Sequence, residues 1–395
     1  MIYLIIVIII TLLFYILLPG SGAFFARSEW REFRLKLAAS SAVPLIDFQK
    51  SRALGDAQCQ GIFKFFGSLE AIQDKYEVWL RSGNFTVSVD MRNVKIYLIP
   101  AINYSVSGEG NDDFHEKNIE IIMDEMPQVL SWERFYSLSQ RTEVMVCGPL
   151  FIDRGKTIFR TSGEGSVTFL IYDGSPETLL RRGIWAGRHR NEFWNIFTPV
   201  SLIAGSFSLF LTAYFLYSIP SLDVLTDITL SLSLVPFMPL FPPGVVLFFI
   251  YRSFWKKARF LRAERDLIRL PLKPFTNYNH DQTGNCTEIQ TGIKYCFRRI
   301  ENPEEAFSVC REREVLIRKA SMFNKENDNP FYYFYQENEG AYDPLLENVI
   351  IEGNPELVAV KCGKVSRFYE YASVCIFFAG MMINFALTFF LIKLI

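Results

Sequence analysis

The sequence predicts an integral membrane protein with four transmembrane α-helices and two cytoplasmic domains. Three observations predict this class: four long runs without a charged residue, cations gathered on one side of those runs, and period-two apolar patterns between the first two runs. We expect the first cytoplasmic domain to be β-rich, a small barrel or a sandwich, and the second to be a smaller α+β domain. Half of the 395 residues are apolar, which excludes intrinsic disorder.

The four charge-free runs are long enough to cross a bilayer, which needs roughly 20 apolar residues. None contains Asp, Glu, Lys or Arg, whereas a soluble helix of that length shows a polar face. The runs cover residues 2–18, 193–222, 228–251 and 371–392. The transmembrane helices predicted from them are residues 2–18, 197–218, 228–251 and 371–392.

The first run, closed by Pro19, Gly20 and Gly22, has two interpretations. A cleaved signal peptide carries cations before a short apolar core. No Lys or Arg precedes this run, and its apolar stretch is longer than such a core. An uncleaved membrane anchor is therefore the preferred interpretation.

The third run contains four prolines within residues 236–243, followed by Gly244. Proline removes a backbone donor and clashes with the preceding turn, so this segment cannot be one regular helix. We predict a spanning helix that is broken by the prolines. A re-entrant hairpin is the alternative, but it would place the next segment outside, against its charges.

The flanking cations predict the orientation, because short loops rich in Lys and Arg stay in the cytoplasm. Cations follow the first and third runs and precede the second and fourth. The loop at residues 218–227 instead has only Asp223 and Asp227, and only Lys393 follows the fourth run. Both termini are predicted to lie outside the cell membrane, and residues 19–192 and 252–370 in the cytoplasm.

The overall charge and the cysteines fit this picture. The net charge of -1 argues against a nucleic-acid partner, which requires a basic excess. The seven cysteines are odd in number and irregularly spaced, and six lie in the predicted cytoplasmic segments, so no disulfide framework is expected.

The first cytoplasmic segment, residues 19–192, begins with an amphipathic pattern at residues 28–37. Trp30, Phe33 and Leu37 recur at helical spacing, and Ser28 can cap the helix. This helix either lies on the inner membrane surface or packs on its own domain, and the sequence does not favour one over the other.

Seven short strands are predicted after this helix, joined by tight turns. Residues 84–91 alternate apolar and polar side chains with period two, the clearest strand signal. The strands are residues 60–66, 77–81, 84–91, 94–99, 143–152, 156–161 and 166–172. The tetrapeptide Ser-Gly-Glu-Gly occurs twice, at residues 107–110 and 162–165. It could cradle a phosphate, but a strand rather than a helix follows the second copy, so a turn is the preferred interpretation.

The second cytoplasmic segment, residues 252–370, opens with a basic juxtamembrane helix at residues 252–273. Residues 287–298 indicate strands, and residues 330–335 form an aromatic run expected to lie in a core. Asn354, Pro355 and Glu356 make a helix start that leads toward the last span.

No catalytic, cofactor-binding or metal-binding residue is predicted. His115, His189 and His280 have no second histidine at ligand spacing, there is no Cys-x-x-Cys, and no nucleotide or nucleophile motif occurs. Residues 112–116 form a polar cluster best interpreted as a solvated loop. Asn384, midway in the fourth span, is interpreted as a helix-packing residue.

The function best supported by the sequence is a non-enzymatic scaffold or accessory subunit that presents cytoplasmic domains at the membrane. Its expected partners are the lipid bilayer and other membrane or cytoplasmic proteins, with no cofactor. The alternative is a transporter component or membrane-embedded enzyme that uses the proline-broken third helix. That alternative predicts a polar cavity containing Asn384, the backbone of residues 236–244 and a loop acid.

Overall fold

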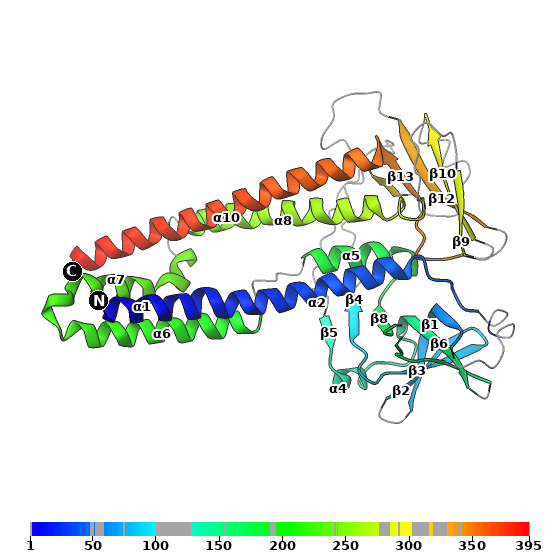
Figure 1. The fold of residues 1–395 in the computed structure, drawn as a ribbon, viewed down its shortest axis with the longest axis horizontal. Helices are drawn as coiled ribbons and strands as arrows, with labels where there is room; N and C mark the ends of the chain where they lie inside the picture. The colour runs from blue at the N-terminus through cyan, green and yellow to red at the C-terminus, as the bar shows by residue number, and fades with distance from the viewer. Residues whose placement is uncertain are drawn as a thin grey trace. The chain divides into compact units, whose positions relative to one another are not determined.

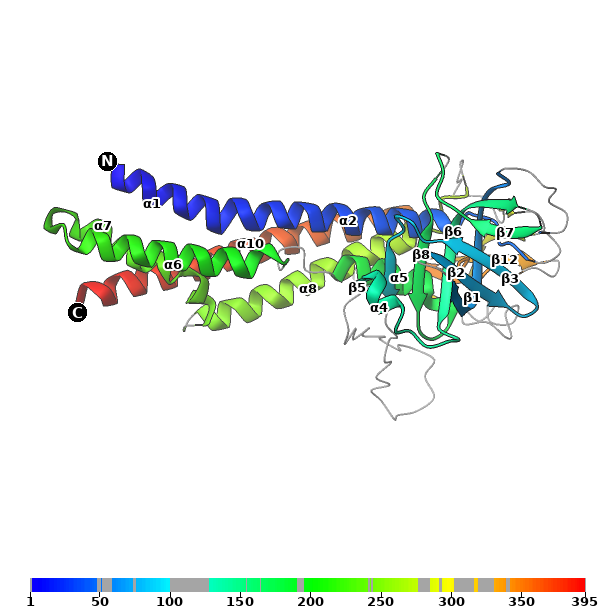
Figure 2. The same ribbon diagram turned by 90° about the horizontal axis from the view of Figure 1, so that it is seen from below.

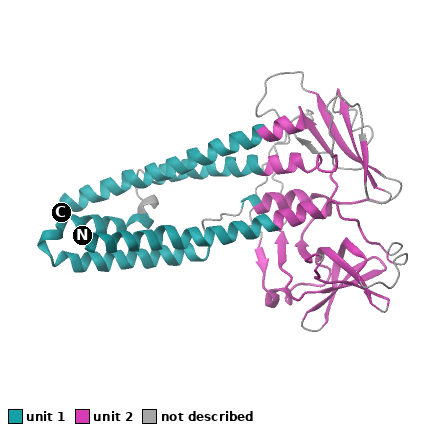
Figure 3. Ribbon diagram, viewed as in Figure 1, with its two compact units in different colours: residues 1–32, 188–262, 361–395 teal, residues 33–187, 263–360 magenta. Residues whose placement is uncertain are grey.

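The computed structural model describes residues 2–47, 51, 59–73, 76–99, 128–153, 155–163, 165–189, 195–240, 242, 244–275, 285–290, 293–301, 316–318, 330–338 and 342–394. The chain divides into two compact units (Figure 3). Unit 1 comprises residues 1–32, 188–262 and 361–395, and is helical. Unit 2 comprises residues 33–187 and 263–360, and holds both β-sheets.

Among the described residues, three helical stretches are long and apolar enough to cross a bilayer: Ile2–Ser40, Phe197–Tyr217 and Pro355–Leu394 (Figure 1). Many of their large apolar side chains are exposed, for example Ile16 at 57%, Phe207 at 63% and Phe390 at 63%. Exposed apolar side chains on an isolated helix are costly in water and favourable in lipid. These stretches are consistent with a membrane protein.

The sequence predicts that the first helix ends before Pro19. In the structure, the first helical stretch instead continues past Pro19 to Ser40. α1 (Ile2–Leu12), a π-helical turn (Leu13–Leu17) and α2 (Leu18–Ser40) follow one another without a break. The wider turn stands just before Pro19, where the missing N–H and the ring would disturb a regular α-helix. It therefore lets the helix continue through the proline.

The third charge-free run is not a single helix in the structure. α7 (Asp223–Ser233) ends within the run, a 3₁₀ segment follows at Val235–Leu240, and α8 (Gly244–Arg269) begins after the prolines. α6 (Phe197–Tyr217) and α7 form a hairpin through a short 3₁₀ turn at Pro220–Leu222, as both views show (Figures 1 and 2).

Polar contacts hold the helices of unit 1 together. The Tyr15 hydroxyl donates to the Leu232 carbonyl at 3.1 Å and lies 3.2 Å from the Ser206 hydroxyl, which joins the first helical stretch to α6 and α7. α8 is joined to α10 (Pro355–Leu394) by a separate contact: the Ser366 hydroxyl of α10 donates to the Ala258 carbonyl of α8 at 2.9 Å. Arg262 and Glu370 form an ion pair between the same two helices.

A closed five-stranded barrel forms the first module of unit 2. β1 (Gly61–Gln73) pairs with β2 (Glu77–Ser82) and with β6 (Glu143–Asp153), so that the sheet closes in the order β1-β2-β3-β7-β6-β1. β3 (Phe85–Asp90) and β7 (Lys156–Phe159) are the parallel pair within the barrel. This connectivity is that of an OB-fold, a Greek-key barrel. The predicted small barrel is thus confirmed, and the sandwich is excluded.

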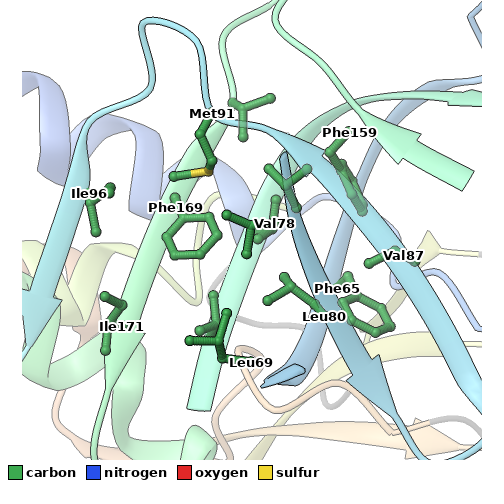
Figure 4. Packing of buried hydrophobic residues seen from close by; sticks show 14 of the residues in the cluster. Phe65, Leu69, Val78, Leu80, Val87, Met91, Ile96, Phe159, Phe169 and Ile171 are labelled. Atoms are coloured by element: carbon green, nitrogen blue, oxygen red, sulfur yellow. The ribbon is translucent and has the colours of Figure 1, made fainter. Parts of the chain in front are cut away.

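One cluster of buried apolar side chains fills the barrel and continues onto the strands beside it (Figure 4). They alternate along the strands with outward-facing residues, as period two requires. Those labelled in the figure are Phe65, Leu69, Val78, Leu80, Val87, Met91, Ile96, Phe159, Phe169 and Ile171.

Three further strands and three helices lie beside the barrel. β8 (Thr168–Tyr172) pairs with β6, and β4 (Ile96–Ile99) joins β8 to β5 (Gln128–Leu130), which is followed by the short α4 (Trp132–Phe135). Phe33 and Leu37 of α2 are fully buried and pack toward Tyr97 and toward Gly183 of α5 (Leu179–His189). In the predicted amphipathic helix at residues 28–37, Phe33 and Leu37 therefore pack on the barrel module, which is the domain-packing alternative.

The second module of unit 2 is a five-stranded sheet in the order β11-β13-β12-β10-β9. The strands are β9 (Asn285–Gln290), β10 (Ile293–Ile300), β11 (Leu316–Arg318), β12 (Phe331–Asn338) and β13 (Val349–Glu352). Cys286 and Cys296 lie directly opposite each other on β9 and β10 and form a disulfide. The sequence predicts no disulfide framework, but this one disulfide forms because the register of the hairpin brings the two cysteines together.

Candidate functional site

The most unusual chemical feature of unit 2 is a buried ion pair that joins its two modules. The Lys64 ammonium, on β1 of the barrel, lies 2.5 Å from the Asp343 carboxylate, which follows β12 of the second module. Neither side chain has any exposure to solvent. Lys and Asp are almost never fully buried unless they are paired, so this contact defines how the two modules meet.

The barrel side supplies further partners for the Lys64 ammonium. It donates to the carbonyl oxygens of Ser40, the last residue of α2, and of Ser41, at 3.0 and 3.2 Å. These carbonyls and the Asp343 carboxylate together satisfy the three donors of an ammonium group. Burial lowers the pKa of Lys64, and the Asp343 carboxylate opposes that shift.

Cys147 stands opposite Lys64 on the neighbouring strand β6 and is also buried. Burial raises the pKa of this thiol, while Ser40 and Lys64 act in the opposite direction. A buried thiol of raised pKa is a poor nucleophile. Cys147 is therefore better explained by packing than by catalysis.

The second module holds Asp343 with a network of its own. The Gln336 amide donates to the Asp343 carbonyl at 2.9 Å, and its oxygen accepts from the Asp343 N–H at 3.2 Å. The Asp343 carboxylate also accepts from the Leu345 N–H at 3.1 Å, and Asn348 accepts from the Gln336 N–H at 3.0 Å. The carboxylate is thus held in place from both modules.

This cluster suits a structural role better than a catalytic one. Lys64, Asp343, Cys147 and Gln336 are all buried, so a substrate would have to separate the modules to reach them. Removing either charge leaves the other buried without its counter-ion, which is strongly unfavourable. The arrangement therefore binds the two modules into one body.

A second feature is a row of four residues on the same side of neighbouring barrel strands, made of the half-buried Trp79, Ile158 and Phe151 and the fully buried Ser88. Strand register places them side by side on β2, β3, β7 and β6. The Lys156 ammonium lies 5.7 Å from the centre of the Trp79 ring, and the Arg160 guanidinium lies 5.9 Å from that of Phe151. We call these six residues the aromatic row; rings with adjacent cations are typical of binding surfaces.

The sequence-derived candidates that belong to the described residues do not gather at either place. In the second Ser-Gly-Glu-Gly copy, Ser162 and Gly165 exchange backbone hydrogen bonds at 3.0 and 3.2 Å, as in a tight turn. Residues 107–110, the polar cluster at 112–116, and His280 lie outside the described residues. His189 ends α5, away in sequence from any other candidate.

Asn384 is buried on α10, at 2% exposure, as a packing role requires. A small cavity at the start of α8 is lined by Gly244, Leu247, Phe248, Phe377, Gly380 and Met381. Its lining is apolar and does not include Asn384. The proline segment is described only in part, because residues 241 and 243 and the side chains of residues 238–240 lie outside the described residues, so the polar cavity of the transport alternative stays a prediction.

Comparison with known proteins gives no match, whether with family models, with curated proteins or with solved structures. Any inference about the function of this chain must therefore come from its own sequence and structure.

Sequence reasoning missed the buried pair, although one signal was present. Lys64 interrupts an apolar strand, with Phe63 before it and Phe65 after it. A lysine flanked by aromatic residues in a strand is unusual for a solvent-exposed position. Nothing near Asp343 marks it as the partner, because the two residues meet only through the packing of the modules.

Proposed function

We propose that this chain is a four-span membrane protein that displays two joined β-modules in the cytoplasm as a docking body for a protein partner. It acts as a scaffold or accessory subunit rather than as an enzyme. The observation that carries the proposal is the buried contact between Lys64 and Asp343.

This ion pair constrains the membrane topology. Two residues in direct contact lie on the same side of a bilayer, so the chain between them crosses it an even number of times. α6 is long and apolar enough for one crossing. The return crossing then falls to α7, the proline segment and the first part of α8, which also lack charge between residues 228 and 251. Freed backbone groups at the break would be covered by the neighbouring helices.

Two observations bear on which side the modules occupy, and they conflict. The Lys and Arg residues flanking the spans favour the cytoplasm. The Cys286–Cys296 disulfide favours an oxidising compartment. We give precedence to the cations, because they flank every span and do not depend on the redox state of one pair.

The topology is tested by labelling single introduced cysteines with a maleimide that does not cross membranes. Ser221→Cys, in the loop after α6, is expected to react in intact cells. Ser139→Cys, in an exposed loop of the barrel module, is expected to react only after permeabilisation. The parent chain corrects for native cysteines. Labelling of Ser139→Cys in intact cells would place the modules outside.

The scaffold role is tested by photo-crosslinking in cells. A photoreactive amino acid at Thr86, exposed beside the aromatic row, is expected to capture one specific protein. The same amino acid at Ser139 is the matched control and is expected to capture none. A chain that purifies alone, with no crosslinked partner from Thr86, would contradict the docking function.

A further inference from the structure

We propose that Cys286, Cys296 and Glu337 form a redox-gated site for a thiophilic divalent cation such as Zn²⁺. The site is closed while the two cysteines form a disulfide and available once they are reduced. This inference goes beyond the scaffold function and does not depend on it.

The three side chains come from three adjacent strands of the second module. Cys286 on β9 and Cys296 on β10 are directly opposite, with Cα atoms 4.1 Å apart. Glu337 on β12 is diagonal to Cys296, and its carboxylate oxygen lies 3.6 Å from the Cys296 sulfur. The two sulfurs and a carboxylate oxygen all lie within 4.8 Å of one another.

This donor set matches the preference of Zn²⁺, which takes thiolate and carboxylate ligands in tetrahedral geometry. At Zn–S distances of about 2.3 Å, two thiolates on one tetrahedral ion lie about 3.8 Å apart. Neighbouring strands can reach that separation through side-chain rotation alone. The fourth position would be left for water or a ligand from a partner.

A cation can reach the three ligands from solvent, because two of them are exposed. Cys286 and Glu337 are exposed, while Cys296 is buried. An ion can thus approach from solvent without opening the sheet. Lys294 and Arg298 are exposed and share the strand face of Cys296, where their charge favours thiolates.

The redox step is a thiol–disulfide exchange. A cellular dithiol supplies two electrons and two protons: the bond between the two sulfurs breaks, both become thiols, and the dithiol becomes a disulfide. Cation binding then releases one proton from each thiol to solvent, and the two thiolates and the Glu337 carboxylate donate to the ion. In a reducing compartment, where disulfides rarely persist, the open form would predominate, and in an oxidising one the closed form would.

The test uses the full chain purified in detergent, with Co²⁺ as the spectroscopic probe. A water-soluble phosphine reduces the disulfide, is itself converted to its oxide by taking oxygen from water, and is then removed under anaerobic conditions. We expect the reduced chain to bind one equivalent of Co²⁺, with a thiolate-to-cobalt absorption band that Zn²⁺ abolishes. The chain that has not been reduced should show no band.

Variants identify the ligands. Cys286→Ser and Cys296→Ser should lose the band, and Glu337→Gln should keep it while weakening binding roughly tenfold. Cys362→Ser, a buried cysteine of α10, is the matched control and should behave as the parent. If the serine variants unfold, protection of Cys286 from maleimide by Zn²⁺ in the reduced parent gives the same information. Absence of a band in the reduced parent, or its survival in Cys286→Ser, would overturn the proposal.

Discussion

The Lys64 ammonium of the barrel lies 2.5 Å from the Asp343 carboxylate of the second module, and both side chains are completely buried. Their contact makes the two modules one unit despite the long helical segment between them in the sequence. A buried ion pair adds little net stability compared with apolar residues, but it makes an incorrect docking of the modules costly. We therefore regard it as the element that specifies this arrangement.

Lys64→Met should lower the free energy of unfolding by about 3–5 kcal/mol, because it leaves the Asp343 carboxylate buried without a counter-ion. Asp343→Asn should do the same, and the double variant should cost clearly less than the two single changes together. Denaturant unfolding of the full chain in detergent measures all three.

The control for this experiment is Arg81→Gln, which removes an exposed ion pair with Glu70. Such a pair contributes less than about 1 kcal/mol. A cost for Lys64→Met no larger than that of Arg81→Gln would show that the buried pair does not hold the modules together.

Gly67→Ala should destabilise the barrel. β1 pairs with β6 up to Ser68 and with β2 from Ser68 onward, so the strand bends at this corner. A Cβ on Gly67 would lie 2.7 Å from the Arg81 carbonyl oxygen, which cannot move without disturbing the ladder. We expect a loss of roughly 1–3 kcal/mol.

Gly163→Ala is the matched control, since a Cβ there meets no atom within 4 Å. Its effect should stay within about 0.5 kcal/mol. Equal midpoints in denaturant for the two variants would argue against a tight corner at Gly67.

The strands of the barrel module were largely predictable, because period-two alternation and tight turns are local signals. Residues 84–91 and 143–152 correspond closely to β3 and β6. The closure of the barrel was not predictable, since alternation tells which residues face inward but not which strands pair. The second half of β1, beyond residue 66, was missed because Gly67 and Ser68 read as a strand end.

The functional features escaped prediction for the same reason. Lys64 was visible as a charge within an apolar strand, but its partner is defined only by tertiary packing. The Cys286–Cys296 pair needed the register of β9 and β10, and spacing alone could not supply it. The continuation of the first helix through Pro19 depended on a π-helical turn that has no simple sequence signal.

The stability contribution of Asp90 should depend on pH. Hydrogen bonds from Arg92, at 2.6 to 3.1 Å, lower the pKa of this carboxyl in the folded protein. A carboxyl with a lowered folded pKa stabilises the fold above its unfolded pKa of about 3.9, and this contribution disappears as the pH falls through the folded value. Asp90→Asn should therefore be less stable than the parent at neutral pH.

The difference between Asp90→Asn and the parent should stay constant from pH 7 to about pH 5 and shrink below the unfolded pKa of about 3.9. Added salt should also reduce it, because Arg92 is exposed. Thermal unfolding across this pH range measures the effect. A difference that persists unchanged well below pH 3 would assign the effect to packing rather than charge.

Asn354 caps the start of α10, and its loss should destabilise that end of the helix. Its side-chain oxygen accepts from the N–H groups of Glu356 and Leu357, at 3.0 and 3.4 Å, and Pro355 occupies the first helical position. Asn354→Ala leaves these donors without their acceptor and should cost about 1 kcal/mol. Asn354→Asp keeps an acceptor and adds a charge that suits the helix N-terminus, so it should be neutral or slightly stabilising. Hydrogen exchange at Glu356 and Leu357 should accelerate in Asn354→Ala alone; equal acceleration in both variants would mean that the cap is not what orders this turn.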